Sequence, residues 1–356
     1  MGSDWPVMST NQELEGFHGI IGIILETIRR KKLGRPEFLN TEMKSKTKKI
    51  IVAVLAIVIG LPVALILTAV AWFSIKDITN GTIVSSGKTR KYLLYVPKTY
   101  DRSRATPLVI SMHAAAMWPA AQMELSQWNK LADEHGFIVV YPSGDAGVLG
   151  GDPWLPRGPK IWNNEQLNVT FISDLIDKLG ATYNIDTTRI YADGFSNGGG
   201  MAFELSCRLS HRVAAVGVVG AAVLTPLNCK DSTPVPMVAF HGTADPLAPY
   251  QGGTSPASPP GPIPFVAVRD WVASWAQRNR CTGDPMDTPI TASIHRLAYM
   301  NCAENAEVIL YTVEGGGHSW PGGKPLPQWM VGRTTRDIDA SRVMWEFFVQ
   351  HRRGPK

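Results

Sequence analysis

A serine, an aspartate and a histidine each follow a separate apolar run of the chain. Ser196 lies between a β-type run (RIYADG) and a helical run (GGMAFELSCRL). Asp245 follows the apolar run VPMVAF, and His318 follows VILYTV. A serine hydroxyl becomes an effective nucleophile when a histidine takes its proton, and a carboxylate fixes the tautomer of that histidine. These residue types, in the chain order Ser, Asp, His, predict acyl transfer through a catalytic triad.

The residues around Ser196, from Gly194 to Gly198, fit the pattern G-x-S-x-G of a sharp strand-to-helix turn. We expect glycine at both ends because a side chain at either position would collide with its neighbours in so tight a turn. The helix N-terminus behind the serine would favour negative charge. The same short pattern also occurs in ordinary turns with an N-cap serine, so Asp245 and His318 carry the catalytic interpretation.

A tetrahedral intermediate needs backbone N–H donors for its oxyanion. One donor is expected from Asn197, the residue after the nucleophile, and the second from the loop His113–Ala116 after an apolar strand. The usual form of this loop has glycine after the histidine, so Ala114 is a departure. The sequence leaves Ala114 and Ala115 open as the second donor, because the Ala114 amide serves only if the turn does not require positive φ there.

Apolar strand-like runs alternate with amphipathic stretches, which is the pattern of a mainly parallel central sheet with helices on both faces. Together with the turn at Ser196, this order predicts the α/β-hydrolase fold, with one catalytic domain at residues 82–352. The expected strands are Lys91–Pro97, Pro107–His113, Phe137–Tyr141, Arg189–Ala192, Val213–Val219, Val235–Phe240 and Val308–Val313. The expected helices are Glu124–His135, Val169–Tyr183, Phe265–Arg278 and Ile338–His351. Residues 249–264, rich in Pro, Gly and Ser, are expected to form a long loop at the rim of the site.

An uncharged apolar run precedes this domain. Residues 50–75 are long enough for a helix that crosses a bilayer core of about 30 Å. Four lysines between residues 44 and 49 come just before the run, so the positive-inside rule places residues 1–49 in the cytoplasm and exports the catalytic domain to a periplasmic or extracellular location. The run is either a retained transmembrane anchor or a signal segment cleaved after Ala71, because residues 69–71 have the small-x-small form of a cleavage site. Met43 is a plausible start for an ordinary signal peptide, and residues 1–42 would then be an upstream, non-native extension.

The charge distribution argues against nucleic acid as a partner. The net charge is +5, and residues 1–49 hold nine Lys and Arg against six Asp and Glu. The remainder is nearly neutral and lacks a basic stripe. His113, His211 and His241 show no metal-binding spacing, so we expect no metal and no other cofactor.

Four cysteines lie in the part of the chain that would be exported, where disulfides form. Three pairings are possible, and the nearest-neighbour scheme, Cys207 with Cys229 and Cys281 with Cys302, closes the shortest loops. We predict this scheme, with buried free thiols as the alternative.

Tryptophans in expected loops after the strands are candidates for substrate contact through an apolar acyl or aryl pocket. Packing beneath a loop is the alternative interpretation for each of them. The candidates are Trp118, Trp154, Trp162 and Trp320.

Three motifs, GFSNGG, HGTADPLAPYQGG and GGGHSWPGG, resemble the polyhydroxybutyrate depolymerase and feruloyl esterase family, over roughly residues 82–350. The resemblance implies a secreted or envelope α/β-hydrolase without a cofactor, acting on esters of hydroxyalkanoates, hydroxycinnamates or related acyl groups. It also supports the two disulfides. Besides Ala114, Asn168 departs from the family, which often has aspartate there.

The sequence therefore predicts a serine esterase that hydrolyses soluble carboxylic esters or short oligomers, such as hydroxyalkanoate oligomers and feruloyl or acetyl esters. Two alternatives stay open. A serine peptidase would use the same triad. A catalytically impaired, hydrolase-like binding protein would explain an altered oxyanion loop, and Ala114 is its only support.

Overall fold

The computed structural model describes residues 77–147, 160–163, 165–221, 229, 232–255 and 263–354. The predicted anchor or signal segment at residues 50–75, the extension before it and the candidate cleavage site after Ala71 lie outside these ranges. Within them, the structure has no helix that is both long and apolar enough to cross a bilayer.

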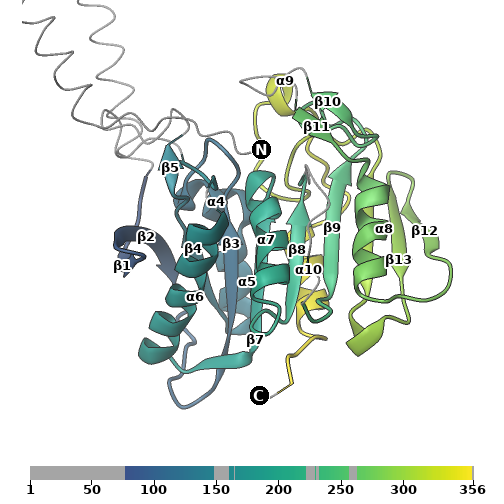
Figure 1. Cartoon of the computed structure of the whole chain (residues 1–356). Helices are drawn as coiled ribbons and strands as arrows, with labels where there is room; N and C mark the ends of the chain where they lie inside the picture. The colour runs from purple at the N-terminus through teal and green to yellow at the C-terminus, as the bar shows by residue number, and fades with distance from the viewer. Residues whose placement is uncertain are drawn as a thin grey trace, which may run out of the picture. The chain divides into compact units, whose positions relative to one another are not determined.

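A ten-stranded sheet forms the centre of the described domain (Figure 1). The strand order across the sheet is β1-β2-β4-β3-β7-β8-β9-β14-β13-β12. The strands are β1 (Gly81–Ser85), β2 (Lys88–Tyr95), β3 (Thr106–Met112), β4 (Ile138–Pro142), β7 (Ile185–Phe195), β8 (Ala215–Val219), β9 (Met237–Gly242), β12 (Met286–Thr291), β13 (Ile294–Tyr299) and β14 (Val308–Val313).

The middle of this sheet is parallel and its two edges are antiparallel. Every neighbouring pair from β4 to β14 across the sheet runs parallel. The pairs outside them, from β1 to β4 on one side and from β14 to β12 on the other, run antiparallel. The prediction of a mainly parallel sheet is confirmed. Since parallel strands end at the same edge of a sheet, the loops after β3, β7, β9 and β14 meet there.

Helices cover both faces of the sheet, as predicted. Side chains of α6, α7 and α8 share one buried apolar cluster with one face, and those of α4, α5 and α10 share another with the opposite face. Figure 1 shows α6, α7 and α8 in front of the sheet and α10 behind it. The helices are α4 (Pro119–Ser126), α5 (Trp128–His135), α6 (Glu165–Thr182), α7 (Asn197–Arg208), α8 (Val268–Arg278), α9 (Gln328–Val331) and α10 (Ala340–Phe348), with a 3₁₀ turn at Ala303–Asn305.

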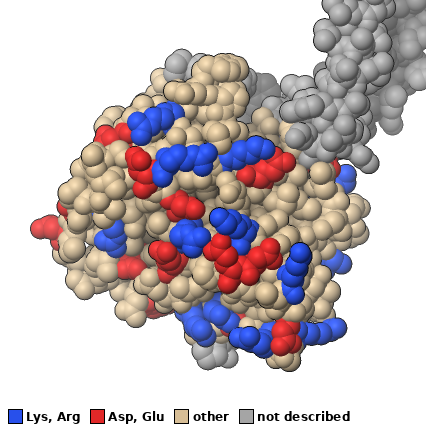
Figure 2. Space-filling model, turned by 180° about the vertical axis from the view of Figure 1, so that it is seen from behind, with Lys and Arg blue, Asp and Glu red and all other residues tan. Residues whose placement is uncertain are grey.

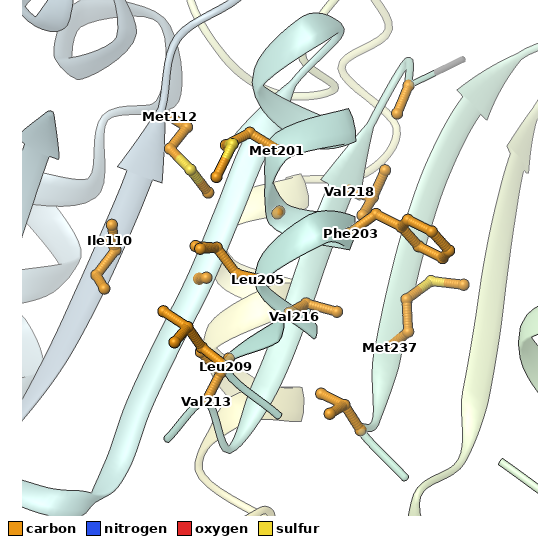
Figure 3. Close-up of a cluster of buried hydrophobic side chains, with 14 of the residues drawn as sticks. Ile110, Met112, Met201, Phe203, Leu205, Leu209, Val213, Val216, Val218 and Met237 are labelled. Carbon is orange, nitrogen blue, oxygen red and sulfur yellow. The ribbon is translucent and has the colours of Figure 1, made fainter. Parts of the chain in front are cut away.

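Strand β3 shows how the sequence pattern arises from this layering. Ile110 and Met112 belong to the first apolar cluster and Val109 to the second, because successive side chains of a strand point to opposite faces. Figure 3 shows Met201 of α7 next to Met112, and Leu205 of α7 belongs to the same cluster. A strand buried on both faces has a continuous apolar run instead of an alternating one, which is what PLVISM displays.

Two of the predicted elements were wrong in part. The helix expected at Glu124–His135 is interrupted at Gln127, whose φ of 57° lies in the left-handed region, so two helices take its place. The loop expected at residues 249–264 contains two short strands, β10 (Gly253–Ser255) and β11 (Ile263–Phe265), which pair antiparallel. Backbone pairing between the two ends of this segment outweighs its Pro- and Gly-rich composition.

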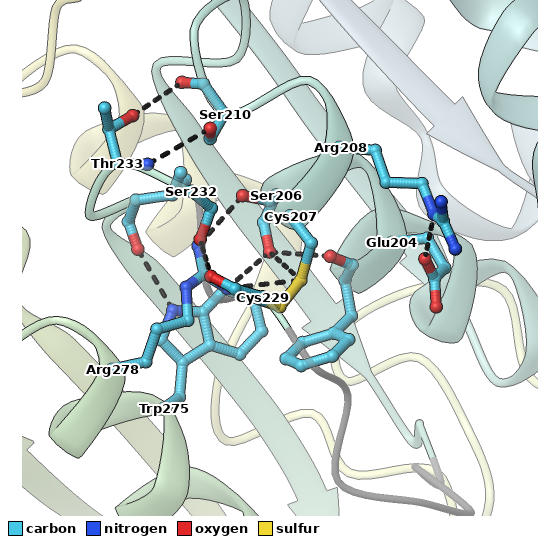
Figure 4. Close-up of a disulfide and its surroundings, with 12 residues drawn as sticks. Glu204, Ser206, Cys207, Arg208, Ser210, Cys229, Ser232, Thr233, Trp275 and Arg278 are labelled. Carbon is cyan, nitrogen blue, oxygen red and sulfur yellow. Dashed lines mark hydrogen bonds and ion pairs between the residues drawn. A yellow bond between two sulfur atoms is a disulfide. The ribbon is translucent and has the colours of Figure 1, made fainter.

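The structure contains both disulfides of the nearest-neighbour scheme, Cys207–Cys229 and Cys281–Cys302. Figure 4 shows the first at the end of α7, beside Arg278 of α8, whose Nη1 donates to Ser206 Oγ at 2.9 Å. The bonded cysteines are 22 and 21 residues apart in the sequence. Closing loops of this size stabilises a fold by about 3 kcal/mol each in the chain-entropy model.

The surface carries charges of both signs. On the face seen in Figure 2, Lys and Arg side chains are interspersed with Asp and Glu side chains. Many are paired across elements, for example Arg342 with Glu134 at 3.0 Å. Exposed pairs of this kind contribute about 0–1 kcal/mol each to stability.

Candidate active site

Ser196 sits at the junction between β7, which ends at Phe195, and α7, which begins at Asn197. Its φ and ψ are 54° and −117°, a strained conformation for a residue with a side chain. Such a conformation costs on the order of 1–3 kcal/mol and persists only where the surroundings enforce it. The strained turn places Ser196 directly after the carboxyl end of β7, at the edge of the sheet where the loops after β3, β9 and β14 also lie.

The two glycines of the turn are required for steric reasons, as the sequence predicted. A Cβ on Gly194 would lie 2.2 Å from the carbonyl oxygen of Gly198. A Cβ on Gly198 would lie 2.3 Å from the carbonyl oxygen of Met112, at the end of β3. Both contacts are with backbone, which has little freedom to move away. The expectation about these positions is confirmed.

Asp245 and His318 form a buried pair beyond the ends of β9 and β14. His318 Nδ1 donates to Asp245 Oδ2 at 2.7 Å. The other carboxylate oxygen, Oδ1, accepts the backbone N–H groups of Leu247 and Ala248, both at 2.8 Å. Both oxygens of the carboxylate are therefore hydrogen-bonded, and this fixes the orientation of Oδ2 toward His318.

The environment keeps Asp245 ionised. Burial alone would raise its pKa, but the hydrogen bond from His318 and the positive potential of His318 and His241 outweigh burial and lower the pKa below the usual value. His241 Nε2 donates to the carbonyl of Ala248 at 2.8 Å and lies 3.4 Å from Asp245 Oδ2. A charged aspartate beside His318 stabilises the imidazolium that forms when the histidine accepts a proton.

Ser196 follows β7 and His318 follows β14, and no hydrogen bond joins the two side chains in the described part of the chain. The ring of His318 packs against Phe195, with 4.9 Å between ring centroids. A Cβ on Gly220, at the end of β8, would lie 3.3 Å from His318 Nδ1. The histidine is thus placed against the residue that precedes the serine. Catalytic hydrogen bonds of this kind are often long in the absence of substrate.

The loop after β3 offers backbone donors near the same edge. The amides of Ala114 and Ala115 donate to no acceptor among the described residues. The left-handed residue of the loop is Ala116, with φ of 60°, and Ala114 is outside the positive-φ region. The substitution of alanine for the usual glycine at position 114 therefore carries no backbone strain.

His113 is hydrogen-bonded through both ring nitrogens, and these bonds define its tautomer. Its Nε2 accepts the backbone N–H of Gly144 at 3.0 Å, so that nitrogen carries no proton. Its Nδ1 must then be the protonated nitrogen and donates to the carbonyl of Ala114 at 2.8 Å. Burial lowers the pKa of His113 to about 4, although the bond to Ala114 acts the other way. A neutral, fully bonded imidazole fixes the peptide plane between Ala114 and Ala115.

Trp162 and Asn197 connect the loop to the nucleophile turn. Trp162 Nε1 donates to the carbonyl of His113 at 2.9 Å, and its backbone N–H donates to Asn197 Oδ1 at 2.8 Å. The neighbouring strand β6 (Lys160–Ile161) accepts the N–H of Ala116 through Lys160, at 2.9 Å, and pairs with β5 (Ala146–Gly147). Trp162 thus has a positioning role that the sequence did not predict, since its partners, the carbonyl of His113 and the side chain of Asn197, are distant in the sequence.

The structure buries the other tryptophans predicted to contact substrate. Trp320 is fully buried, and its Nε1 donates to Ser341 Oγ at 3.0 Å. Trp320 thus packs against α10, and the substrate contact stays a prediction. Trp118 is also buried, at the start of α4. Trp154 lies outside the described residues.

Asn168, the second departure from the family pattern, takes part in a buried polar network. Its Oδ1 accepts Arg90 Nη2 at 2.8 Å, and its Nδ2 donates to Asp145 Oδ1 at 2.6 Å. Arg90 also donates to the carbonyl of Ser143 at 3.0 Å. An amide suits this position because it donates to one partner and accepts from the other. The network fixes the segment that holds Gly144 against His113.

A cavity of about 190 Å³ is lined by residues of β1, β2 and the 143–145 segment, and by none of Ser196, Asp245 and His318. Within the described ranges, no group of three or more His, Cys, Asp and Glu side chains is arranged to hold a metal ion.

Asp193, three residues before the nucleophile, is a fully buried carboxyl group that the sequence did not single out. Its Oδ1 accepts Ser111 Oγ at 2.7 Å, and Ser111 Oγ in turn accepts Gln122 Nε2 at 3.0 Å. Its Oδ2 makes no hydrogen bond with a described residue. Burial raises the pKa of Asp193 to about 7, and Ser111 and the nearby indole of Trp128 offset only part of that effect.

The raised pKa predicts a loss of stability as the pH rises. An unfolded aspartate has a pKa of about 3.9, so between roughly pH 4 and pH 7 the folded chain binds the proton more tightly and folding weakens with increasing pH. Asp193→Asn removes the titration, and we expect this variant to exceed the wild type in unfolding free energy at pH 8 by up to about 4 kcal/mol. Urea unfolding from pH 4 to pH 8 measures the difference. The exposed Asp284→Asn is the control, and an unchanged pH slope in Asp193→Asn would contradict the prediction.

Comparison with known proteins gives a consistent set of relatives. A family model described as "Esterase PHB depolymerase" matches residues 90–275. Feruloyl esterase B of Piromyces equi is 32% identical over 245 residues, which are 66% of this chain and 44% of that protein. The putative esterase NocK of Nocardia uniformis subsp. tsuyamanensis is 29% identical over 287 residues, which are 76% of this chain and 82% of that protein. The chain thus spans less than half the length of the Piromyces relative.

Among solved structures, the acetyl xylan esterase from Aspergillus awamori is similar, with a TM-score of 0.50 and 13% sequence identity. The similarity covers 67% of this chain and 93% of that chain. At this identity the likeness concerns the fold alone. It confirms the predicted fold class.

Proposed function

The chain belongs to the esterase PHB depolymerase family and is a carboxylic ester hydrolase, and on this premise we propose that Ser196, His318 and Asp245 form its catalytic triad. The observation that carries the proposal is the strained turn at Ser196 beside the buried, hydrogen-bonded pair of His318 and Asp245.

In the proposed reaction, Ser196 Oγ attacks the ester carbonyl carbon while His318 Nε2 takes its proton. The bond between the carbonyl carbon and the alcohol oxygen then breaks, and His318 returns the proton to the leaving alcohol. A water molecule repeats the sequence on the acyl-serine and releases the acid. Asp245 stays ionised throughout and stabilises the imidazolium form of His318.

The oxyanion is held by backbone amides on the other side of the serine. Asn197 contributes the first N–H, at the positive end of α7, and Ala114 and Ala115 supply the second side of the site. The peptide groups that contain these two amides are already held at their carbonyl ends. The carbonyl of His113, in the same peptide group as the Ala114 N–H, accepts Trp162 Nε1, and the carbonyl of Ala114, in the same peptide group as the Ala115 N–H, accepts His113 Nδ1. Donors fixed in this way need no reorganisation as negative charge develops.

The absence of positive φ at Ala114 removes the support for a catalytically impaired binding protein. The names of the relatives favour feruloyl and acetyl esters as substrates, and the family name favours hydroxyalkanoate oligomers. We propose soluble esters of these acids as the substrate class. The two disulfides support an exported enzyme, with residues 50–75 as its anchor or cleaved signal.

A hydrolysis screen tests the proposed function. The full chain is incubated with p-nitrophenyl acetate and butyrate, methyl ferulate, acetylated sugars and hydroxybutyrate oligomers, and the released acid is measured. We expect turnover of one or more of these classes without added metal. A folded chain that hydrolyses none of them would contradict the proposal.

A further inference from the structure

One tryptophan of the described domain is unlike the others. Trp329 of α9 is 88% exposed, whereas every other described tryptophan is buried. The buried ones are Trp118, Trp128, Trp162, Trp271, Trp275, Trp320 and Trp345. An indole left in water loses the free energy that burial of so large an apolar side chain would provide. The next residue, Met330, is also exposed, so the tip of α9 presents apolar side chains to solvent.

Helix α9 packs directly on the loop that carries the proposed catalytic base. The backbone N–H of His318 donates to the carbonyl of Val331 at 2.6 Å, and that of Gly317 donates to the carbonyl of Arg333 at 2.9 Å. A Cβ on Gly317 would lie 2.1 Å from the Val331 oxygen, so the two segments are in close backbone contact. Trp329 is two residues from Val331, which places its backbone on the order of 10 Å from that of His318.

The mechanism decides which part of an ester would meet this tryptophan. The carbonyl oxygen must face the amides of Asn197, Ala114 and Ala115, whereas the alcohol oxygen must face His318, which protonates it on departure. The alcohol half of the substrate therefore leaves the serine on the His318 side. Helix α9 adjoins that side.

We propose that Trp329 is a stacking platform for a sugar ring in the alcohol half of the ester, one or two residues beyond the scissile bond. This inference rests on the proposed function of Ser196, His318 and Asp245. A sugar ring has an apolar C–H face that covers the indole, and its hydroxyl groups stay hydrated at so exposed a position, so no polar group is buried without a partner. An aryl group would gain more from an enclosed apolar pocket, where both of its faces are covered.

The test compares three esters of one acid, ferulic or acetic, whichever the wild type hydrolyses: the methyl, benzyl and xylobiosyl esters. In the full chain carrying Trp329→Ala, we expect the ratio of kcat/KM for the xylobiosyl ester to kcat/KM for the methyl ester to fall about tenfold, mainly through a higher KM, because the contact is the same in ground and transition states. Trp329→Phe should restore part of the ratio. Val84→Ala, which truncates another exposed apolar side chain (70% exposed) on the edge strand β1, is the control.

The outcomes separate this inference from the proposed function. An unchanged ratio in an active Trp329→Ala enzyme overturns the platform and leaves the triad intact. An equal loss with the benzyl ester overturns the assignment to a sugar and indicates an aryl site. A wild type that hydrolyses neither methyl ester, and no other ester of the screen, overturns the proposed function, and the platform with it.

Discussion

Replacement of Ser196 by alanine is expected to lower kcat for ester hydrolysis by about 10⁴-fold or more, because the reaction then has no group to form the acyl-enzyme. The remaining rate would come from the backbone amides and from substrate binding alone. Steady-state kinetics on p-nitrophenyl acetate measures the loss. The melting temperature should stay close to that of the wild type. Alanine has the same backbone strain as serine at a φ of 54°, and the serine hydroxyl makes no hydrogen bond in the described domain.

The matched control for this variant is Ser274→Ala on α8, where the hydroxyl bonds only to the carbonyl of Trp271 at 2.7 Å. We expect this control to keep the activity of the wild type. A Ser196→Ala enzyme that retains more than about a tenth of the wild-type kcat would assign the nucleophile to another residue.

Asp245→Asn is expected to lower kcat by about 10⁴-fold while the fold is retained. The reason lies in the hydrogen bonds that the two carboxylate oxygens accept. The N–H groups of Leu247 and Ala248 both point at one oxygen, so the carbonyl oxygen of the new amide must occupy that side. Its NH₂ group then faces His318 Nδ1, which becomes an acceptor. The proton of His318 moves to Nε2, the nitrogen that should take the proton of Ser196, and general-base catalysis is lost.

Kinetics and circular dichroism together check this prediction. The exposed Asp270→Asn on α8 is the control for the loss of one negative charge. A variant with the dichroism spectrum of the wild type and a kcat reduced less than about tenfold would show that His318 does not depend on Asp245 for its tautomer.

Most of the central sheet follows from sequence patterns, for a physical reason. Strands such as β3, β9 and β14 are buried on both faces, so each is a continuous apolar run with polar residues directly after it. The steric need for glycine at 194 and 198 also follows from local geometry. The positions of Ser196, Asp245 and His318 at one edge then follow from the parallel arrangement of the strands.

Other features depend on contacts that sequence patterns do not encode. Strand β12 is exposed along its whole length, so it has no apolar run to mark it. The break at Gln127 carries neither glycine nor proline. The left-handed residue of the loop after β3 is Ala116 and not Ala114, because the turn is set by the bonds of His113 and Lys160. The exposure of Trp329 arises from the docking of α9 on the loop of His318.

The central claim is that Ser196 is a nucleophile activated by His318 and Asp245. Its most direct measurement is covalent labelling of the folded full chain with a fluorophosphonate, followed by peptide mapping by mass spectrometry. The account predicts one phosphonyl group per chain, on Ser196, with no labelling of Ser196→Ala and strongly slowed labelling of Asp245→Asn. A folded, unlabelled wild type, or a label on a different serine, would contradict it.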